Sequence, residues 1–315
     1  MVEPILAADG RPRVRRPVLG YAMVLAATCM WGINGSVSKA ILGEGLSSPR
    51  LTEIRSTGAA IVLVLALVLT QPWRLRVGRG EILFLLAFGI LGLAAVQWLY
   101  FFAIHRLEVG IALLIQYLAP VLIALWAAFV LKEKVRRRIW VAIILSLGGL
   151  VLVVDLRHGF SLDALGTAAA LGAALAFATY ILLAEHAVGT RDPVSLLALG
   201  FTVAALFWAV VQPWWSFPAG IVDEHAHLDG ALLDLTLPVW LLMLTMIVVG
   251  TIVPFLLLVG ALRHITATRA GVTAMFEPVA GALIAYALLG ESLSGPQLVG
   301  GAIVLAGILL AQTAR

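Results

Sequence analysis

The sequence has little cysteine and little charge. Cys29 is the single cysteine among 315 residues, so the chain can form neither an intrachain disulfide nor a cysteine-based metal site. Charged residues make up 12% of the chain and hydrophobic residues 62%, and the mean hydropathy is +1.06. Soluble domains are about half apolar and about a quarter charged. The composition excludes a soluble globular protein and indicates an integral protein of the cell (inner) membrane, with the lipid bilayer as its surroundings.

Motifs for nucleotides and nucleic acids are missing as well. No GxxxxGK[ST] sequence is present, which disfavours a pump driven by ATP. The sequence pI is 9.6, but the basic residues lie between hydrophobic segments, where they report membrane topology rather than nucleic-acid binding. We therefore expect no nucleic-acid partner and no cofactor.

Ten apolar segments are long enough to cross a membrane as helices. About 20 apolar residues are needed to span about 30 Å of hydrocarbon, and runs such as 61–69 lack the alternation that a membrane β-barrel requires. The fold class we predict is all-α: a polytopic membrane protein with ten transmembrane helices in two five-helix inverted repeats. The spans are expected near 18–42, 52–70, 82–104, 109–131, 137–156, 165–186, 194–214, 238–262, 268–289 and 296–312.

The basic residues gather on one side of these spans. With the N-terminus inside the cell, sixteen of the twenty-one Lys and Arg residues fall in cytoplasmic segments. The other five are Lys39, Arg50, Arg55, Arg106 and Arg157. Cytoplasmic loops carry an excess of Lys and Arg. We therefore expect a multi-pass protein with both termini in the cytoplasm, which requires an even number of spans.

The C-terminal third repeats an earlier segment at an offset of 158 residues. The matched residues include Pro120 and Pro278, Glu133 and Glu291, and Gly149 and Gly307. The first helices of the two halves match more weakly, at an offset of 146 that pairs Trp31 with Phe177. Five helices are an odd number, so the second half enters the membrane in the opposite orientation. The expected domains are 1–156, with a cytoplasmic tail at 1–17, and 165–315, joined by a loop at 157–164.

Short motifs follow one another along the chain, and all but the first of them occur in both halves. They are Trp31-Gly32-Ile33-Asn34 followed by Lys39, then Pro120-Val121 and Pro278-Val279, Leu-Lys-Glu at 131–133 and Leu-Gly-Glu at 289–291, and Gly148-Gly149 and Gly300-Gly301. In this order and spacing the chain resembles the EamA family of the drug/metabolite transporter superfamily over nearly its whole length. In the sixth helix, Phe177-Ala178 stands where the family has a Trp-Gly-like pair.

The resemblance implies a secondary active transporter driven by a gradient. We expect an exporter of small organic metabolites such as amino acids, working by alternating access with a small-molecule solute as its partner, as a monomer or a homodimer. Phosphorylated solutes are disfavoured, because no Lys or Arg falls in the middle of a predicted span. Two other classes stay open: an intramembrane enzyme acting on lipid or head-group substrates, and a membrane subunit that does not transport.

Glu277 is the acidic residue expected near the middle of a span. An ionised carboxylate there costs about 2.5–3.5 kcal/mol on insertion scales, so its surroundings have to compensate it. A carboxyl group that gains a proton when one side is open and loses it when the other is open suits a proton-coupled carrier. Glu277 is therefore a candidate for coupling and for solute contact. The alternative is a hydrogen-bonded Glu that only stabilises the helix beside Pro278.

Pro120 and Pro278 fall in the middle of the fourth and ninth spans. Proline cannot donate a hydrogen bond to the carbonyl four residues earlier, so the carbonyls of Gln116 and Ala274 lose their partners. Freed backbone groups at membrane depth are tolerated where protein or a polar cavity satisfies them. Matched breaks indicate either a central binding site or a packing kink.

Further polar and aromatic residues are candidates for solute binding. Trp31 and Asn34 share a face of the first helix, with Ser38 one turn on. The full set that we predict to bind solute is Trp31, Asn34, Gln97, Gln116, Tyr117, Tyr180, Thr251 and Glu277. Each of these residues can instead serve only to pack helices together, as amides in membrane spans commonly do.

Charged residues near the outer ends of the spans suggest a gate. Lys39, Arg55 and Arg106 are expected at the rim, where they can pair with Glu44, Glu53 or Glu108 or simply extend toward the interface. The segment 213–238 carries a His225-Ala226-His227 sequence among carboxylates. We interpret this segment as a solvated loop and predict no metal site and no catalytic residues.

Overall fold

A computed structural model describes residues 16–107, 109–154, 163–227, 236–289 and 294–313. Ten helical spans run through these residues, close to the ten predicted from hydropathy. Eight of them are long and apolar enough to cross a membrane by length and composition. The fifth span has 17 residues and falls just short, and the ninth is interrupted in its middle. The predicted all-helical polytopic fold is confirmed.

The first half contributes five spans. They are α1 (Pro17–Gly43), α2 (Ser48–Thr70), a third span built from α3 (Ile82–Leu86), η3 (Ala87–Ala94) and α4 (Ala95–Ile104), a fourth built from α5 (Val109–Gln116) and α6 (Ala119–Phe129), and α7 (Arg137–Val153). Two 3₁₀ turns, η1 (Pro72–Leu75) and η2 (Arg79–Glu81), connect the second and third spans.

The second half repeats this order. Its spans are α8 (Ala164–Ala187), α9 (Pro193–Val211), an eighth built from α10 (Val239–Ile247), η7 (Val248–Ile252) and α11 (Val253–Ala261), a ninth built from α12 (Ala267–Ala274) and α13 (Glu277–Leu289), and α14 (Gly295–Thr313). Between α9 and α10 lie η5 (Trp214–Ser216), η6 (Ala219–Asp223) and an antiparallel pair of short strands, β1 (His225–His227) and β2 (Thr236–Pro238). The hydropathy pattern gave no sign of these strands.

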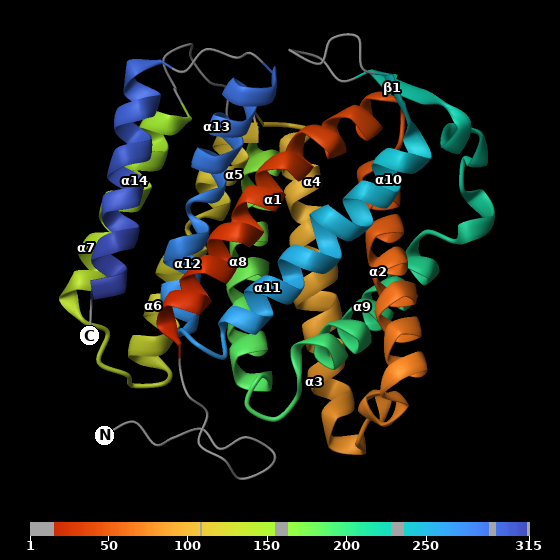
Figure 1. The fold of residues 1–315 in the computed structure, drawn as a ribbon, viewed down its shortest axis with the longest axis horizontal. Helices are drawn as coiled ribbons and strands as arrows, with labels where there is room; N and C mark the ends of the chain where they lie inside the picture. Colours follow the sequence, from red (N-terminus) through yellow and green to blue (C-terminus); the bar gives the residue numbers. More distant parts are fainter. Residues whose placement is uncertain (1–15, 108, 155–162, 228–235, 290–293, 314–315) are drawn as a thin grey trace.

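The two halves pack around an approximate two-fold axis. The second span of each half packs against its counterpart, α2 on α9, and so does the fifth, α7 on α14. The third span of the first half packs on the first helix of the second, α4 on α8, and the equivalent contact joins α11 to α1. Contacts that exchange in this way are expected of inverted repeats. Figure 1 shows α7 and α14 side by side at one edge of the bundle.

Glycine allows the closest of these contacts. A Cβ on Gly149 would lie 2.7 Å from the carbonyl oxygen of Gly300, and a Cβ on Gly300 would lie 2.6 Å from the carbonyl oxygen of Gly149. The backbones of α7 and α14 therefore touch at the matched glycine pairs. Small residues at helix interfaces permit this approach in membranes, where van der Waals packing and hydrogen bonds replace the hydrophobic effect.

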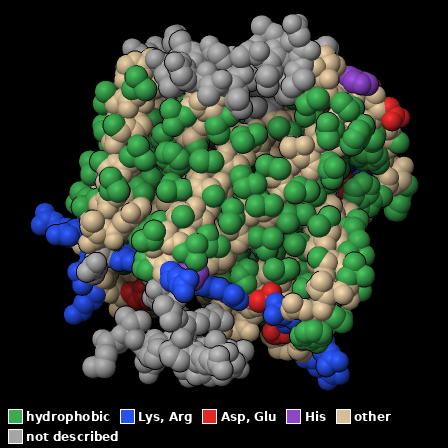
Figure 2. All heavy atoms as spheres, in the orientation of Figure 1, with side chains coloured by type: hydrophobic (Ala, Val, Ile, Leu, Met, Phe, Trp, Pro, Cys, Tyr) green, Lys and Arg blue, Asp and Glu red, His purple; other side chains and the backbone are tan. Residues whose placement is uncertain are grey.

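The surface separates an apolar wall from a basic edge. Leu69, Leu83 and Val210 each expose more than three quarters of their surface and belong to the outer wall of the bundle. Figure 2 shows hydrophobic side chains across this face and Lys and Arg side chains along its lower edge. That edge is the end of the bundle where α1 begins and α14 ends, which we name the terminus end. The other end is named the opposite end.

Candidate solute-binding cavity

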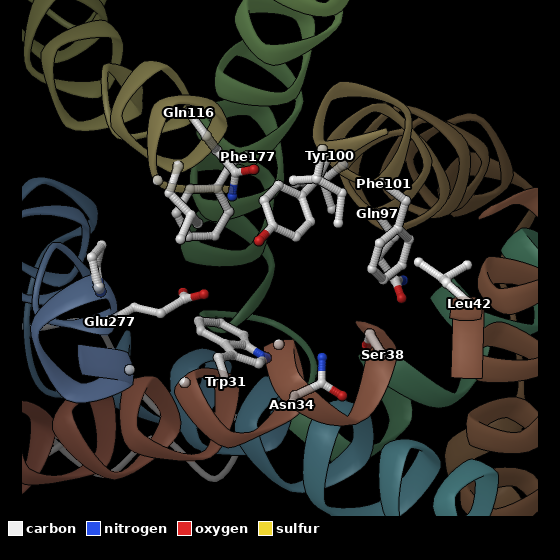
Figure 3. A pocket seen from close by; sticks show the side chains of 18 of the residues that line it. Trp31, Asn34, Ser38, Leu42, Gln97, Tyr100, Phe101, Gln116, Phe177 and Glu277 are labelled. Carbon is white, nitrogen blue, oxygen red and sulfur yellow. The ribbon is translucent and has the colours of Figure 1, made fainter. Parts of the chain in front are cut away.

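A cavity of about 710 Å³ lies between the two halves. Helices α1, α2, α4 and α5 and the end of α7 in the first half line it, together with α8, α11 and α13 of the second. The lining continues to Gly43, His105, Gly110 and Val154, which stand at or near helix ends at the opposite end of the bundle. Its volume is in the range of about 300–1,000 Å³ that is usual for small-molecule sites. Figure 3 shows the side chains that point into it.

Aromatic rings close the cavity on the side of the terminus end. The ring of Trp31 packs edge-on against Phe177 at 6.4 Å and Phe255 at 5.4 Å between centroids. Behind them, Tyr180 lies 6.3 Å from Phe177 and 5.3 Å from Phe255. Tilted and edge-to-face pairs at such separations are favourable for aromatic rings. Trp31 and Phe177 are the residues that the repeat pairs, so the two first helices meet at this floor.

Glu277 lies at the floor of the cavity, at the first residue of α13. The Tyr117 hydroxyl donates a hydrogen bond of 2.6 Å to its Oε2. A carboxylate at a helix N-terminus is also favoured by the helix dipole. The hydrogen bond from Tyr117 and the dipole of α13 therefore both stabilise the Glu277 carboxylate. The structure adds that one of them comes from the other half of the protein.

Both residues stand at helix breaks. Helix α5 ends at Gln116 and α12 ends at Ala274, each four residues before a proline, and the chain resumes as α6 and α13. These are the two residues whose carbonyls proline leaves without a donor. Tyr117 is the residue directly after the end of α5, and Glu277 is the residue at which α13 begins. The interruption turns both side chains toward the middle of the bundle, where they form their hydrogen bond. Pro278 lines the cavity, whereas Pro120 does not.

Arg55 lies inside the cavity and not at its rim. The expected start of the second span at 52 is wrong by four residues: α2 begins at Ser48, so Arg55 stands two turns within the helix and exposes only 4% of its surface. It is not among the partners of Glu53, whose carboxylate is bound by Arg50. The Ser-Ser-Pro sequence before Arg50 is a signal for this earlier start, because serine and proline favour the first turn of a helix.

The Arg55 guanidinium is fixed by a π-helical turn in the eighth span. Its Nε donates to the Thr251 hydroxyl and its Nη2 donates to the Gly250 carbonyl, both at 2.9 Å. Pro254 stands four residues after Gly250 and cannot donate to that carbonyl, so the oxygen is free for Arg55. Sequence reasoning overlooked Pro254, which follows the same rule as Pro120 and Pro278. π-Helical turns are frequent at functional sites.

The presence of Arg55 corrects an expectation about charge. No Lys or Arg was expected in the middle of a predicted span, which disfavoured phosphorylated solutes. Arg55 lies two turns inside α2 and lines the cavity, so the cavity does contain a cationic group, of the kind that forms charge-assisted hydrogen bonds with anions. The ring of Phe101 lies 5.4 Å from the guanidinium carbon and adds a cation–π contact.

Amide side chains supply further polar atoms to the wall. Asn34, Gln97 and Gln116 line the cavity, and in each the side-chain oxygen is buried without a hydrogen-bond partner among the described residues. A buried unpaired acceptor costs about 1–3 kcal/mol, so these oxygens favour a ligand or water that donates to them. Ser38 and Tyr100 complete the polar lining, and in Figure 3 the Tyr100 hydroxyl points toward the centre of the cavity.

Three of the predicted solute-binding residues lie behind the lining. Tyr117 acts through its hydrogen bond to Glu277, and Thr251 acts through Arg55. Tyr180 is fully buried beneath the aromatic floor and is not part of the cavity wall. Its expected contact with solute is therefore not present in this conformation, because Phe177 and Phe255 pack between α1 and the Tyr180 ring.

The ion pairs expected at the rim differ from those that the described residues form. Arg106 does lie near the opposite end, but its partner is Asp163 at 3.5 Å, in a pair that is about 40% exposed on each side. Arg50 is tied to the segment after α9 by hydrogen bonds to the carbonyls of Gln212 and Pro213. The Lys39 side chain and Glu108 lie outside the described residues, and so does the side chain of His227.

Ion pairs join the two halves at the terminus end. Arg191 pairs with Glu81 at 2.7 Å and donates to the carbonyls of Arg74 and Arg76. Arg74 in turn lies 3.3 Å from Asp192. Burial alone would raise the pKa of Asp192, but hydrogen bonds from Ser195 and the charges of Arg74 and Arg263 hold this pKa below its ordinary value. The connections between α2 and α3 and between α8 and α9 are thereby tied together.

Comparison with known proteins gives two matches to one family. The EamA-like transporter family matches residues 18–155 and again 164–313. The uncharacterized inner membrane transporter YicL of Salmonella typhimurium is 27% identical over 272 residues, which cover 85% of this chain and 87% of that protein. The threonine/homoserine exporter RhtA of S. typhimurium is 28% identical over 240 residues, 76% of this chain and 72% of RhtA.

A solved structure supports the fold independently. A crystal structure described only as that of a protein has a TM-score of 0.73, with 20% identity, and covers 93% of this chain and 96% of its own. At that identity the likeness shows the fold alone. The two family matches together cover most of the chain. The protein therefore belongs to the EamA-like transporter family, as a multi-pass membrane transporter with two EamA repeats and not as an enzyme.

Proposed function

We propose that the protein is a secondary active exporter of small organic metabolites, with amino acids as the favoured class, and that Glu277 couples export to protons. The observation that carries this proposal is the hydrogen bond between Tyr117 and Glu277. It joins the broken helices of the two halves at the floor of the cavity. A change in the protonation of Glu277 therefore alters a contact that joins the two halves.

The shape of the cavity supports alternating access. Its lining reaches helix ends at the opposite end of the bundle, whereas the aromatic floor and the ion pairs of Arg191 and Arg74 close the terminus end. This arrangement corresponds to one of the two states of a carrier. The second state requires the halves to rock about the floor, with the terminus-end pairs separating.

Glu277 suits the coupling role because of where its carboxyl group lies. It touches both the cavity and the interface between the halves, so its charge affects solute and packing at once. Protonation removes a charge that is costly in the membrane and weakens the attraction for a cationic group in the cavity. Proton binding and the binding of such a group therefore oppose each other, which is what an exchanger needs.

The relatives and the basic edge support the solute class and the direction. RhtA is a threonine/homoserine exporter, and a cavity of about 710 Å³ accommodates an amino acid with surrounding water. Lys and Arg side chains gather at the terminus end (Figure 2), so we propose that this end faces the cytoplasm of a cell with the protein in its inner membrane.

The test is counterflow in proteoliposomes with a pool of labelled amino acids, organic cations, carboxylates and sugars, under imposed pH gradients. Wild type is compared with Glu277→Gln and with Glu133→Gln, an exposed carboxylate near the terminus end. We expect wild type and Glu133→Gln to carry solute in response to the pH gradient, and Glu277→Gln to lose that response. No flux of any pooled solute would overturn transport, and an unchanged pH response in Glu277→Gln would overturn coupling at this residue.

A further inference from the structure

Two side chains of opposite charge face one cavity without pairing. Arg55 comes from α2 and Glu277 from α13, and both line the cavity. Their charges interact, yet among the described ion pairs within 4 Å neither residue appears. Opposite charges held apart, one on the buried Arg55 and one on the partly buried Glu277, are costly, because each has lost water without gaining a partner of opposite charge. A ligand that bridges them recovers this cost.

The Arg55 guanidinium keeps donors available for such a ligand. It has five N–H groups, of which the bonds to Thr251 and Gly250 occupy one at Nε and one at Nη2. Among the described residues no hydrogen bond uses Nη1. The bound half of the guanidinium fixes its plane, so the remaining half presents a preorganised pair of donors. A carboxylate is the anion that fits such a fork with two parallel hydrogen bonds.

The Glu277 carboxylate is held in a similar way. Its Oε2 accepts the Tyr117 hydroxyl, while no described hydrogen bond involves Oε1. An ammonium group is a compact cation with three donors. It can therefore bind Oε1 without displacing Tyr117. In Figure 3 the Glu277 carboxylate points across the cavity toward Trp31 and Tyr100, not into the protein.

We infer that the cavity selects zwitterions, with the ammonium group of the solute bound by Glu277 and its carboxylate bound by Arg55. This inference rests on the proposed transport function and deepens it by naming the charge pattern of the solute. Two charge-assisted hydrogen bonds of about 2.8 Å with the carbon of an α-amino acid between them bridge a gap wider than 4 Å. A solute with one charge leaves either Arg55 or Glu277 without a partner of opposite charge, and a neutral solute leaves both without one.

The contacts with Glu277 and Arg55 involve only the ammonium and carboxylate groups of the solute, so they do not depend on the amino-acid side chain. Asn34, Gln97 and Ser38 also line the cavity, and Figure 3 shows them away from Glu277, on the side of Phe101, the ring that lies against the Arg55 guanidinium. They are available to contact a polar side chain. Selection for the zwitterion and selection among amino acids are therefore separable.

The experiment is competition against labelled threonine in the counterflow assay. Three competitors differ in the charges that they carry: threonine has both, its methyl ester lacks the carboxylate, and N-acetylthreonine lacks the ammonium. In wild type we expect threonine to compete at least about tenfold better than either analogue, since each lost charge-assisted hydrogen bond is worth that much. If the pool identifies another transported amino acid, its ester and N-acetyl derivatives replace those of threonine.

Variants assign each charge to its residue. Arg55→Gln should lose the preference for threonine over the methyl ester and keep the preference over N-acetylthreonine, whereas Glu277→Gln should do the reverse. Arg106→Gln removes an exposed cation that lies outside the cavity lining and should leave both preferences unchanged. Arg55→Lys keeps the charge and should retain part of the preference. It also guards against a folding defect in Arg55→Gln, together with a check of monodispersity in detergent.

The outcomes separate this inference from the transport proposal. Flux of pooled solutes with equal competition by all three threonine forms, or flux confined to solutes with a single charge or none, would overturn the zwitterion site and leave transport standing. Counterflow of no solute at all would overturn transport itself. Loss of both preferences in either single variant would show that the residues act on packing and not on separate charges, and would likewise reject the assignment.

Discussion

The two copies of the repeat share their breaks but not the residues at them. At the offset of 158, Tyr117 corresponds to Met275 and Ala119 to Glu277. The prolines, the interrupted helices and their positions are alike, while the hydroxyl comes from one copy and the carboxylate from the other. The duplicated features build the scaffold. The chemistry arises where the copies differ, and it is completed only when both halves come together.

The same contrast appears where the third span packs against α8 and the eighth span packs against α1, which are the first helices of the two halves. Gly92 in η3 corresponds to Gly250 in η7, and Tyr180 corresponds to Asn34 at the offset of 146. Gly92 packs against Tyr180 and Gly250 packs against Asn34, so the two contacts are equivalent. In one copy the partner is an amide that lines the cavity, and in the other it is a phenol beneath the floor. Equivalent positions in the two copies therefore differ in their access to the cavity, because Phe177 and Phe255 cover the Tyr180 ring.

The largest expected effect concerns the Tyr117–Glu277 contact. Tyr117→Phe removes a donor from a partly buried carboxylate, and a hydrogen bond to a charged group is worth about 1.5–3 kcal/mol. We expect the rate of counterflow at limiting solute to fall about 10- to 100-fold. Met275→Leu, the equivalent position in the other copy, should change it less than about twofold, because it alters only apolar packing. Equal losses in both variants would show that the two breaks are functionally alike.

The next effect tests the two glycine contacts. A Cβ on Gly250 would lie 2.0 Å from Oδ1 of Asn34, whereas a Cβ on Gly92 would lie 3.4 Å from its nearest atoms in Tyr180. Gly250→Ala should therefore destabilise the protein by about 1–3 kcal/mol through overpacking, while Gly92→Ala should be close to neutral. Thermal unfolding in detergent measures both. The comparison fails if Gly92→Ala is the more damaging change.

A smaller effect is expected at Pro254, which has Val96 as its counterpart. Pro254→Ala restores an N–H that competes with Arg55 for the Gly250 carbonyl. A neutral hydrogen bond contributes about 0.5–1.5 kcal/mol, so we expect solute affinity to fall about 2- to 10-fold. Unchanged affinity in Pro254→Ala would mean that the Thr251 contact alone positions Arg55.

The sequence predicted the scaffold better than the site, and for physical reasons. Hydropathy follows bilayer thickness, so the spans were placed to within a few residues, and the proline rule located both breaks. Cavity membership depends on where helices begin and on which face they turn. A four-residue error at the start of α2 moved Arg55 from the rim into the cavity, and the partner of Glu277 came from a residue 160 positions away that no local pattern connects to it.

The smallest effect contrasts the cavity with the terminus end. The pair between Arg74 and Asp192 is partly exposed, and such pairs contribute about 0–1 kcal/mol. Because the folded state holds the pKa of Asp192 below its ordinary value of 3.8, its contribution is present above that pH and is lost as the pH falls through the lower folded value. Thermal unfolding of wild type and Asp192→Asn should therefore differ slightly at pH 7 and converge at strongly acidic pH. The difference should also shrink at high salt, where exposed charges are screened. A difference that persists in acid and in salt would instead assign Asp192 the purely structural task of capping α9, where it accepts the backbone N–H of Ser195.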